Sequence, residues 1–118
     1  MKIIMDLDDT LFIRTKKTKE YFKLSQKYYE LAIINEKINK KMFKLFNDAD
    51  EKIILTGRNG KFFRDITLAQ LDESHVDWQT LLLCPKDTLV LDWKKNIVKG
   101  LKKQGWKWID NDTDYRRK

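Results

Sequence analysis

The sequence has few of the residues that build disulfide frameworks or zinc sites. Its 118 residues include one cysteine, Cys84, and one histidine, His75. A single cysteine cannot form an internal disulfide, which is typical of a reducing compartment, so we expect a cytoplasmic protein. Without a cysteine and histidine cluster a zinc site is not expected. His75 lies among polar residues and is expected on the solvated surface.

Long hydrophobic runs are missing too. No stretch approaches the roughly 18–20 apolar residues of a membrane-spanning helix. The amino terminus carries only Lys2 before a short apolar stretch, so we expect neither a membrane segment nor a secretory signal. Repeats, low-complexity segments and linkers are absent as well. A chain of this length is therefore expected to form one domain over residues 1–118.

Positive charge is in excess. Lysine and arginine total 25 residues against 18 aspartate and glutamate residues, which gives a net charge of +7. This excess favours an anionic partner, such as nucleic acid or a phosphorylated metabolite, by electrostatic steering. Several lysines recur at helical spacing, however, so solvated helix faces are an alternative explanation of the charge.

Four short apolar runs are expected to be strands. They span about residues 2–6, 52–56, 80–84 and 106–110. Near-continuous apolar strands that alternate with helices predict a parallel sheet with helices on both faces and right-handed crossovers. Ligands bind such sheets at the carboxyl ends of the strands. The sequence places Asp6, Thr56 and Asp110 at those ends.

Three helices are predicted between these strands. The first covers about 36–47 with Asn35 as its cap, the second about 61–73, and the third about 93–104 with Asp92 as its cap. One face of the first helix carries Ile38, Met42, Leu45 and Phe46. In the first connection, residues 13–34 are apolar nearly all round. We expect that segment to be a flap, a minimal helical cap or a dimer contact.

The most informative residues follow the first predicted strand. Lys2-Ile3-Ile4-Met5 runs into Asp6-Leu7-Asp8-Asp9-Thr10-Leu11-Phe12. Carboxylates at the end of a buried strand are unfavourable unless a cation or a reaction uses them, so this position predicts a catalytic site. In an extended chain Asp6 and Asp8 leave on the same face, roughly 6–7 Å apart, while Asp9 points the other way. The alternative is that Asp8 and Asp9 only form a turn and a cap.

This stretch resembles the first motif of the haloacid dehalogenase-like (HAD) phosphohydrolases, and three further motifs follow in order. Ile53-Ile54-Leu55-Thr56-Gly57-Arg58 is similar to the second, and Ile109-Asp110, with Asp114 four positions on, is similar to the fourth. A lysine opening the helix after the third strand would be the third motif. The resemblance implies an α/β fold, a three-layer Rossmann-like core with four to five parallel strands and helices on both faces.

The resemblance also implies a role for each matching residue. Asp6 would attack phosphorus to give an aspartyl phosphate. Asp8 would protonate the leaving oxygen and then take a proton from the attacking water. Thr56 would bind a phosphoryl oxygen, and Gly57 would let the backbone approach it closely. Arg58 would either contact a substrate phosphate or fix a loop.

The active-site lysine has three candidates. Lys94, in Asp92-Trp93-Lys94-Lys95-Asn96-Ile97, is preferred because it lies at a helix start, where the family usually places this residue. Lys95 and Lys86 are the alternatives. In this role the lysine would offset the charge of the nucleophile and the phosphate.

A divalent cation is expected beside the acids. Asp6, Asp8 and Asp110 would repel one another in one site and raise one another's pKa values. Oxygen ligands and a phosphate substrate favour Mg2+. The resemblance implies that Asp6, Asp110 and the backbone carbonyl of Asp8 hold the ion, with Asp112 or Asp114 supplying outer contacts.

The expected substrate is a nucleotide or a nucleic-acid end. The segment from Thr56-Gly57-Arg58 to Ile109-Asp110 is similar to the phosphatase part of polynucleotide kinase-phosphatases and to small phage-type relatives, and the positive charge agrees with such a substrate. One alternative is a small-metabolite or protein phosphatase that uses the same residues. Another is a non-catalytic relative that binds phosphorylated ligands or a partner protein, although a pure binder has no need for Asp8.

Overall fold

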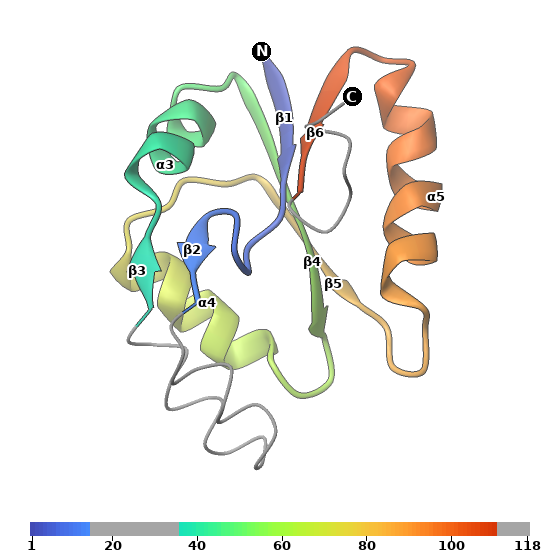
Figure 1. The fold of residues 1–118 in the computed structure, drawn as a ribbon, viewed down its shortest axis with the longest axis horizontal. Coiled ribbons are helices and arrows are strands. Elements are labelled where there is room, and N and C mark those ends of the chain that lie inside the picture. The colour runs from blue at the N-terminus through green and yellow to red at the C-terminus, as the bar shows by residue number, and fades with distance from the viewer. Residues whose placement is uncertain (15–35, 111–118) are drawn as a thin grey trace.

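A parallel sheet lies at the centre of the computed structural model, which describes residues 1–14 and 36–110 (Figure 1). The sheet order is β5-β4-β1-β6. Its strands are β1 (Lys2–Met5), β4 (Glu51–Asn59), β5 (Thr80–Cys84) and β6 (Trp106–Ile109). All four predicted strands are therefore confirmed, and so is the predicted parallel pairing.

The order of the strands determines where the helices lie. The chain passes from β1 to β4 and β5 in one direction, and then returns across the sheet to β6 on the far side of β1. Because parallel crossovers are right-handed, this reversal puts the last helix on the opposite face of the sheet from the earlier ones. Ligands of such sheets bind at the carboxyl ends of the strands beside the reversal, here β1 and β6.

Helices cover both faces of the sheet and give three layers. α3 (Lys40–Asn47) and α4 (Arg64–Glu73) lie on one side, and α5 (Val90–Lys102) lies on the other (Figure 1). Alternate side chains of β1 serve the two faces: Ile3 packs in one apolar cluster with Phe46 and Leu71, whereas Ile4 packs in a second cluster with Val98. The α/β fold with helices on both faces is thus confirmed.

A second, two-stranded sheet was not predicted. β2 (Phe12–Ile13) pairs antiparallel with β3 (Lys37–Ile38), with Phe12 opposite Ile38. Phe12 is fully buried, and its amide donates to the Leu7 carbonyl at 2.9 Å. The small sheet therefore ties the segment that enters α3 to the turn that follows β1. Most of the expected flap or cap at 13–34 lies outside the described residues.

The predicted start of the first helix is wrong. α3 begins at Lys40, and its cap is Asn39, whose side chain accepts a hydrogen bond from the Met42 amide at 3.3 Å. Ile38 belongs to β3, because its backbone pairs with Phe12. Ile38 is therefore part of the two-stranded sheet and not of the helical face on which the spacing placed it. Asn35, the predicted cap, lies outside the described residues.

The other two helices also begin elsewhere than predicted. β4 continues beyond Thr56 to Asn59, and Asn59 then closes a turn in which its carbonyl accepts from the Phe63 amide at 2.9 Å, so α4 starts only at Arg64. α5 starts at Val90, and Asp92 lies in its first turn rather than at its cap. An acid in a first turn is still favourable, because it faces the positive end of the helix dipole.

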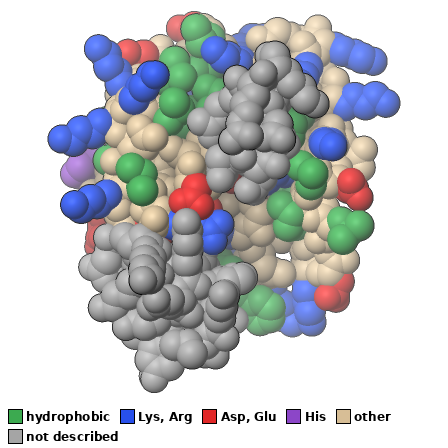
Figure 2. Space-filling view, in the orientation of Figure 1, with side chains coloured by type: hydrophobic (Ala, Val, Ile, Leu, Met, Phe, Trp, Pro, Cys, Tyr) green, Lys and Arg blue, Asp and Glu red, His purple; other side chains and the backbone are tan. Residues whose placement is uncertain are grey.

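On the face shown in Figure 2, basic side chains are spread out rather than gathered in one place. Figure 2 shows Lys and Arg side chains projecting around the rim of the viewed face, with acidic and basic groups side by side near its middle. This distribution agrees with solvated helix and strand surfaces as one source of the net charge. Among the described residues, no helix is both long and apolar enough to cross a membrane.

Gly57 provides a test of how α5 packs against β4. A Cβ at this position would lie 2.7 Å from Cγ1 of Val90, the first residue of α5, whereas a Cβ at Gly100 would meet nothing within 4 Å. We expect Gly57→Ala to lower the free energy of unfolding by about 1–3 kcal/mol through overpacking, and Val90→Ala in the same chain to restore part of the loss.

Gly100→Ala is the matched control, and urea unfolding measures both changes. Gly100 lies inside α5, where alanine is the better helix former by roughly 0.5–1 kcal/mol. This variant should therefore be more stable than the wild type. Equal effects of the two alanine substitutions would contradict the proposed contact between Gly57 and Val90.

Candidate functional site

A tight turn carries Asp6 and Asp8 away from β1. The Asp6 amide donates to the Ile109 carbonyl at 3.0 Å, which extends the pairing with β6 by one residue. The Leu7 carbonyl then accepts from both the Thr10 and the Phe12 amides, and Leu7 and Phe12 are fully buried. The apolar residues of the motif thus fix the turn in the core, while the acids between them are held at the carboxyl end of the sheet.

Asp9 faces a different partner from the other two acids. It has a φ of 60°, a left-handed conformation that aspartate tolerates better than most residues. Its carboxylate accepts from the Arg14 amide at 3.1 Å and pairs with Nε of Arg14 at 3.4 Å. The separation expected between Asp9 and its neighbours is therefore present.

Lys94 joins two carboxylates that come from opposite ends of the chain. Its Nζ donates to Oδ1 of Asp6 at 2.9 Å and to Oδ2 of Asp110 at 2.6 Å. All three side chains are almost completely buried. Lys94 lies in the second turn of α5, where Val98, one turn further on, anchors the helix to the sheet. The structure thus brings together three of the predicted site residues.

Burial makes the charges of this cluster depend on one another. It raises the pKa of Asp6 to about 7 despite the nearby Lys94 ammonium, and the charge of Asp110 acts in the same direction. For Lys94, burial alone would lower the pKa, but the charges of Asp6 and Asp110 outweigh it and raise the pKa. The ammonium is therefore stably charged, whereas Asp6 lacks part of the positive charge that would keep it ionised at neutral pH.

Thr56 lies inside β4 rather than at its end. It is fully buried, and its Oγ1 accepts from the Arg58 amide at 3.2 Å. The pairing of β4 with β5 is irregular between Thr56 and Asn59, which is how the strand continues beyond the predicted end. Gly57 follows in this irregular stretch, where its missing side chain makes room for Val90 of α5.

Arg58 holds Asp8. Its Nε and one terminal nitrogen donate to the two carboxylate oxygens of Asp8 at 3.3 and 2.9 Å, and its other terminal nitrogen donates to Oγ1 of Thr67 at 3.1 Å. The Arg58 side chain is 2% exposed. Of the two roles expected for Arg58, these contacts match the fixing of a loop.

Three further residues at this site were not foreseen. Glu36 is buried beside Arg58, Thr67 binds Arg58 from α4, and Oγ1 of Thr10 donates to Oδ2 of Asp6 at 3.4 Å. Thr10 stands four positions after Asp6 in the same motif. Thr67 lies on the same helical face as the apolar Leu71, four positions on. A polar residue on an apolar helical face could have indicated that Thr67 is buried. The spacing around Glu36 contains no comparable signal.

Two of the remaining candidates lie outside this cluster. Lys95 and Lys86 are exposed, unlike Lys94. Asp112 and Asp114, the expected outer metal contacts, lie outside the described residues. The described candidates for a role at Asp6 are therefore Lys94, Asp110 and Thr10.

The carboxylates fit a magnesium ion in number and in chemistry. No group of three or more histidine, cysteine, aspartate or glutamate side chains suited to a metal occurs within residues 1–14 and 36–110. Asp6 and Asp110 nevertheless reach the same Lys94 nitrogen, and burial and the charge of Asp110 raise the pKa of Asp6 despite that ammonium. Mg2+ is commonly bound through one or two carboxylates together with water and substrate phosphates, so these two acids are enough.

Comparisons with known proteins bear on the fold. No protein-family model matches the chain, and no curated protein matches it in sequence. Among solved structures, a chain of "Structure of Pnkp1/Rnl/Hen1 complex" is similar, with a TM-score of 0.57 and 20% sequence identity. The match covers 80% of this chain but 33% of the other, so the present chain spans about a third of that neighbour. At this identity the likeness shows the shared α/β fold alone.

Lys94 provides a test of the buried cluster. Because folding raises the pKa of Asp6 from 3.8 to about 7, it favours the protonated acid, and the contribution of Asp6 to stability falls as the pH rises from about 4 through 7. Without the ammonium this loss grows. We expect Lys94→Met to lower the free energy of unfolding by about 3–5 kcal/mol near pH 8 and by clearly less at pH 5.

Urea unfolding at the two pH values checks this expectation, with Lys95→Met as the matched control. Lys95 is the next residue of α5 and is exposed, so its substitution should change stability by about 0.5 kcal/mol or less. A destabilisation by Lys94→Met that is the same at pH 5 and pH 8 would show that its ammonium does not neutralise these carboxylates.

Proposed function

We propose that this protein is a Mg2+-dependent phosphatase of the HAD type that works through an aspartyl-phosphate intermediate. The observation that carries the proposal is the contact of the buried Lys94 with both Asp6 and Asp110. Two acids that close neighbouring strands share one cation, as the motifs of that family require. Arg58 separately holds Asp8, two residues after Asp6.

The reaction uses the two acids of the first motif in different ways. An oxygen of Asp6 attacks phosphorus, the bond from phosphorus to the leaving oxygen breaks, and the Asp8 carboxyl gives its proton to that oxygen. A water molecule then attacks phosphorus, Asp8 takes one of its protons, and the Asp6 carboxylate leaves with inorganic phosphate as the product. The first step uses the Asp6 carboxylate and the Asp8 proton, and the second step regenerates both.

The neighbouring residues support these steps by charge and by hydrogen bonding. Lys94 neutralises part of the charge that Asp6 and the phosphate bring together, and the Thr56 hydroxyl would bind a phosphoryl oxygen. Mg2+ would be held by Asp6, Asp110 and the backbone carbonyl of Asp8, and it supplies the remaining positive charge at the phosphate. The raised pKa of Asp6 supports this need for a further cation.

The proposed substrate is a phosphorylated nucleotide or a nucleic-acid end. The net charge of +7 supports an anionic substrate. The motifs resemble those of the phosphatase part of polynucleotide kinase-phosphatases, and a chain of the Pnkp1/Rnl/Hen1 complex has a similar fold. A small metabolite or a phosphoprotein is the competing substrate class, since it would use the same catalytic residues.

Phosphate release from an aryl phosphate tests the mechanism. We expect activity with Mg2+, none with a chelator and none for Asp6→Asn. Asp8→Asn should lower kcat/KM by about 10²–10⁴, the usual contribution of a general acid. Asp9→Asn is the matched control, because Asp9 pairs with Arg14 and asparagine tolerates the same backbone conformation. Activity that survives chelation or Asp6→Asn would refute the mechanism.

A substrate panel tests the substrate class. Nucleotides and oligonucleotides phosphorylated at the 3′ or the 5′ end are compared with sugar phosphates and a phosphopeptide. If the substrate is a nucleic-acid end, kcat/KM for the oligonucleotide should be the largest and should fall steeply between 50 and 200 mM salt, because phosphate contacts release counterions. Turnover of mononucleotides or metabolites alone would refute the nucleic-acid substrate and leave the mechanism intact.

A further inference from the structure

Exposed apolar side chains gather at the end of the sheet that carries the site. Among residues 1–14 and 36–110, six large apolar side chains are exposed, and four of them belong to the connections that follow β4 and β5: Phe62, Leu89, Val90 and Leu91. Both connections leave the carboxyl end of the sheet (Figure 1), where Asp6 also follows β1. Single exposed apolar residues are common on proteins, but a group of them indicates a binding surface.

Phe62 is the aromatic member of this group, and a well-defined turn presents it. Its side chain is 43% exposed. The Asn59 carbonyl accepts from the Phe62 amide at 3.3 Å, and the Asn59 side chain accepts from the Lys61 amide at 2.8 Å. The Gly60 amide donates to the Cys84 carbonyl at 3.0 Å, which ties the turn to β5. An aromatic ring on a turn that is already ordered loses little conformational freedom when it binds a ligand.

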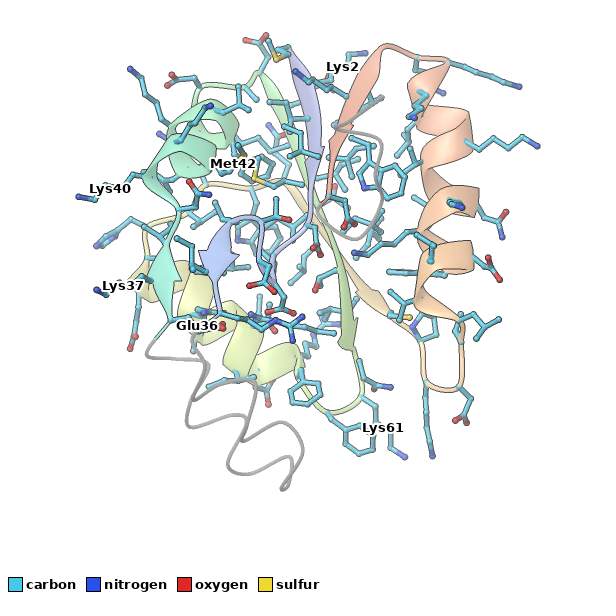
Figure 3. All side chains as sticks on the ribbon, in the orientation of Figure 1. Lys2, Glu36, Lys37, Lys40, Met42 and Lys61 are labelled. Atoms are coloured by element: carbon cyan, nitrogen blue, oxygen red, sulfur yellow. The ribbon has the colours of Figure 1, made fainter. Side chains whose placement is uncertain are left out.

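A cation already lies over this ring. Nζ of Lys61 is 5.5 Å from the centroid of Phe62, and Figure 3 shows Lys61 in the turn after β4. Lys61 is exposed, and a lysine side chain is long and flexible. A flat ligand can therefore take the place of the ammonium over the ring while the ammonium moves to a neighbouring anion. A nucleotide offers both groups, since its base stacks on aromatic rings and its phosphate binds lysine.

The turn lies at a distance from the catalytic residues that a nucleic-acid strand can span. A strand rises about 3.3 Å per residue, so Asn59, three positions beyond Thr56 in β4, lies roughly 10 Å further along. That is about three nucleotides of a stacked strand, at roughly 3.4 Å each. A strand whose terminal phosphate reaches Thr56 would thus bring one of its first few bases to Phe62.

We propose that Phe62 and Lys61 form a stacking platform for an unpaired base close to the phosphorylated end of a single-stranded nucleic acid. The ring stacks on the base, and the ammonium binds a phosphate of the backbone. Neither residue contacts the phosphate that is removed. This inference rests on the proposed function and specifies its substrate. Because every base has a flat face, the platform selects an unpaired base rather than a base sequence.

Abasic nucleotides test the stacking directly. Oligonucleotides phosphorylated at the 3′ or the 5′ end are prepared with one abasic nucleotide at each of the first four positions from that end. We expect the wild type to lose about tenfold in kcat/KM at one of these positions, because a stacked base is missing there. Phe62→Leu should remove this difference between intact and abasic substrates, whereas Phe62→Tyr should retain it.

Leu89→Ala is the matched control for an apolar surface of any kind. Leu89 follows the neighbouring strand and is 75% exposed, more than Phe62, but it has no aromatic ring. This variant should keep the ratio of intact to abasic substrate. An equal loss in Leu89→Ala and Phe62→Leu would indicate a general apolar surface, such as one for a partner protein, and would overturn the platform. A wild-type ratio of about 1 at all four positions would overturn it too.

The salt dependence of oligonucleotide binding tests Lys61. Lys61→Met should weaken binding and reduce the slope of log affinity against log salt concentration by about 0.7, the value for one phosphate contact on a single strand. Lys103→Met is the control, because Lys103 is exposed but lies at the far end of α5, away from the turn. Equal slopes for Lys61→Met and the wild type would remove the ammonium from the platform.

A binding measurement separates this inference from the proposed function. The fluorescent base 2-aminopurine is placed at each of the same four positions in oligonucleotides without a terminal phosphate, so no turnover is needed. Stacking should quench its fluorescence at one position with the wild type and with Phe62→Tyr, but not with Phe62→Leu. Absence of this difference overturns the platform even if phosphate is released. A wild type that quenches the base but releases no phosphate refutes the phosphatase alone.

Discussion

The contact of Lys94 with Asp6 and Asp110 is the interaction on which the rest of the structure depends. It joins residues from β1, α5 and β6, and it does so in a place from which water is almost excluded. Without this contact, the buried carboxylates would lose their shared ammonium and the buried ammonium would lose both carboxylates. The main sheet order, with β6 beside β1, is what brings the second carboxylate to the ammonium. The position of α5 over that face of the sheet brings the ammonium itself.

Residues from both faces of the sheet contact the acids of the site. Lys94 reaches Asp6 from α5, whereas Arg58 is held by Thr67 of α4, on the opposite side (Figure 1). Asp6 and Asp8, the proposed nucleophile and the proposed acid/base carboxyl, therefore have separate cations, although they are two residues apart in the chain. In the proposed mechanism, one acid bonds to phosphorus while the other changes its protonation, and this separation means that no common counter-charge has to move between them.

The sequence predicted the parts of this molecule that follow from periodicity and from chain order. Four apolar runs gave the strands, and the acids that follow the first and the last of them are neighbours because those strands pair. Lys94 was preferred over Lys95 from its position near a helix start, and its burial agrees with that choice. Where the spacing of apolar residues and the pairing of distant strands disagreed, the predicted helix boundary was wrong. Ile38 fits a helical stripe in sequence, but its backbone pairs with Phe12.

The contacts of Arg58 could not be predicted from spacing alone. The partners of its side chain come from three separate segments of the chain, and Asp8 lies 50 positions away in sequence. The sequence left open whether this arginine meets a phosphate or a loop, because both roles need a positive charge at the same strand. The contacts that Arg58 makes with α4 and with the entrance of β3 match the fixing of a loop.

The distribution of these contacts along the chain has a consequence for synthesis. Asp6 leaves the ribosome long before Lys94 and Asp110, which both belong to the last quarter of the described chain. Until α5 and β6 have docked, a nascent chain holds a carboxylate at the end of β1 that has no counter-ion and no neighbouring strand on that side. Synthesis and docking of α5 and β6, rather than formation of the first strands, are therefore the events that create the site.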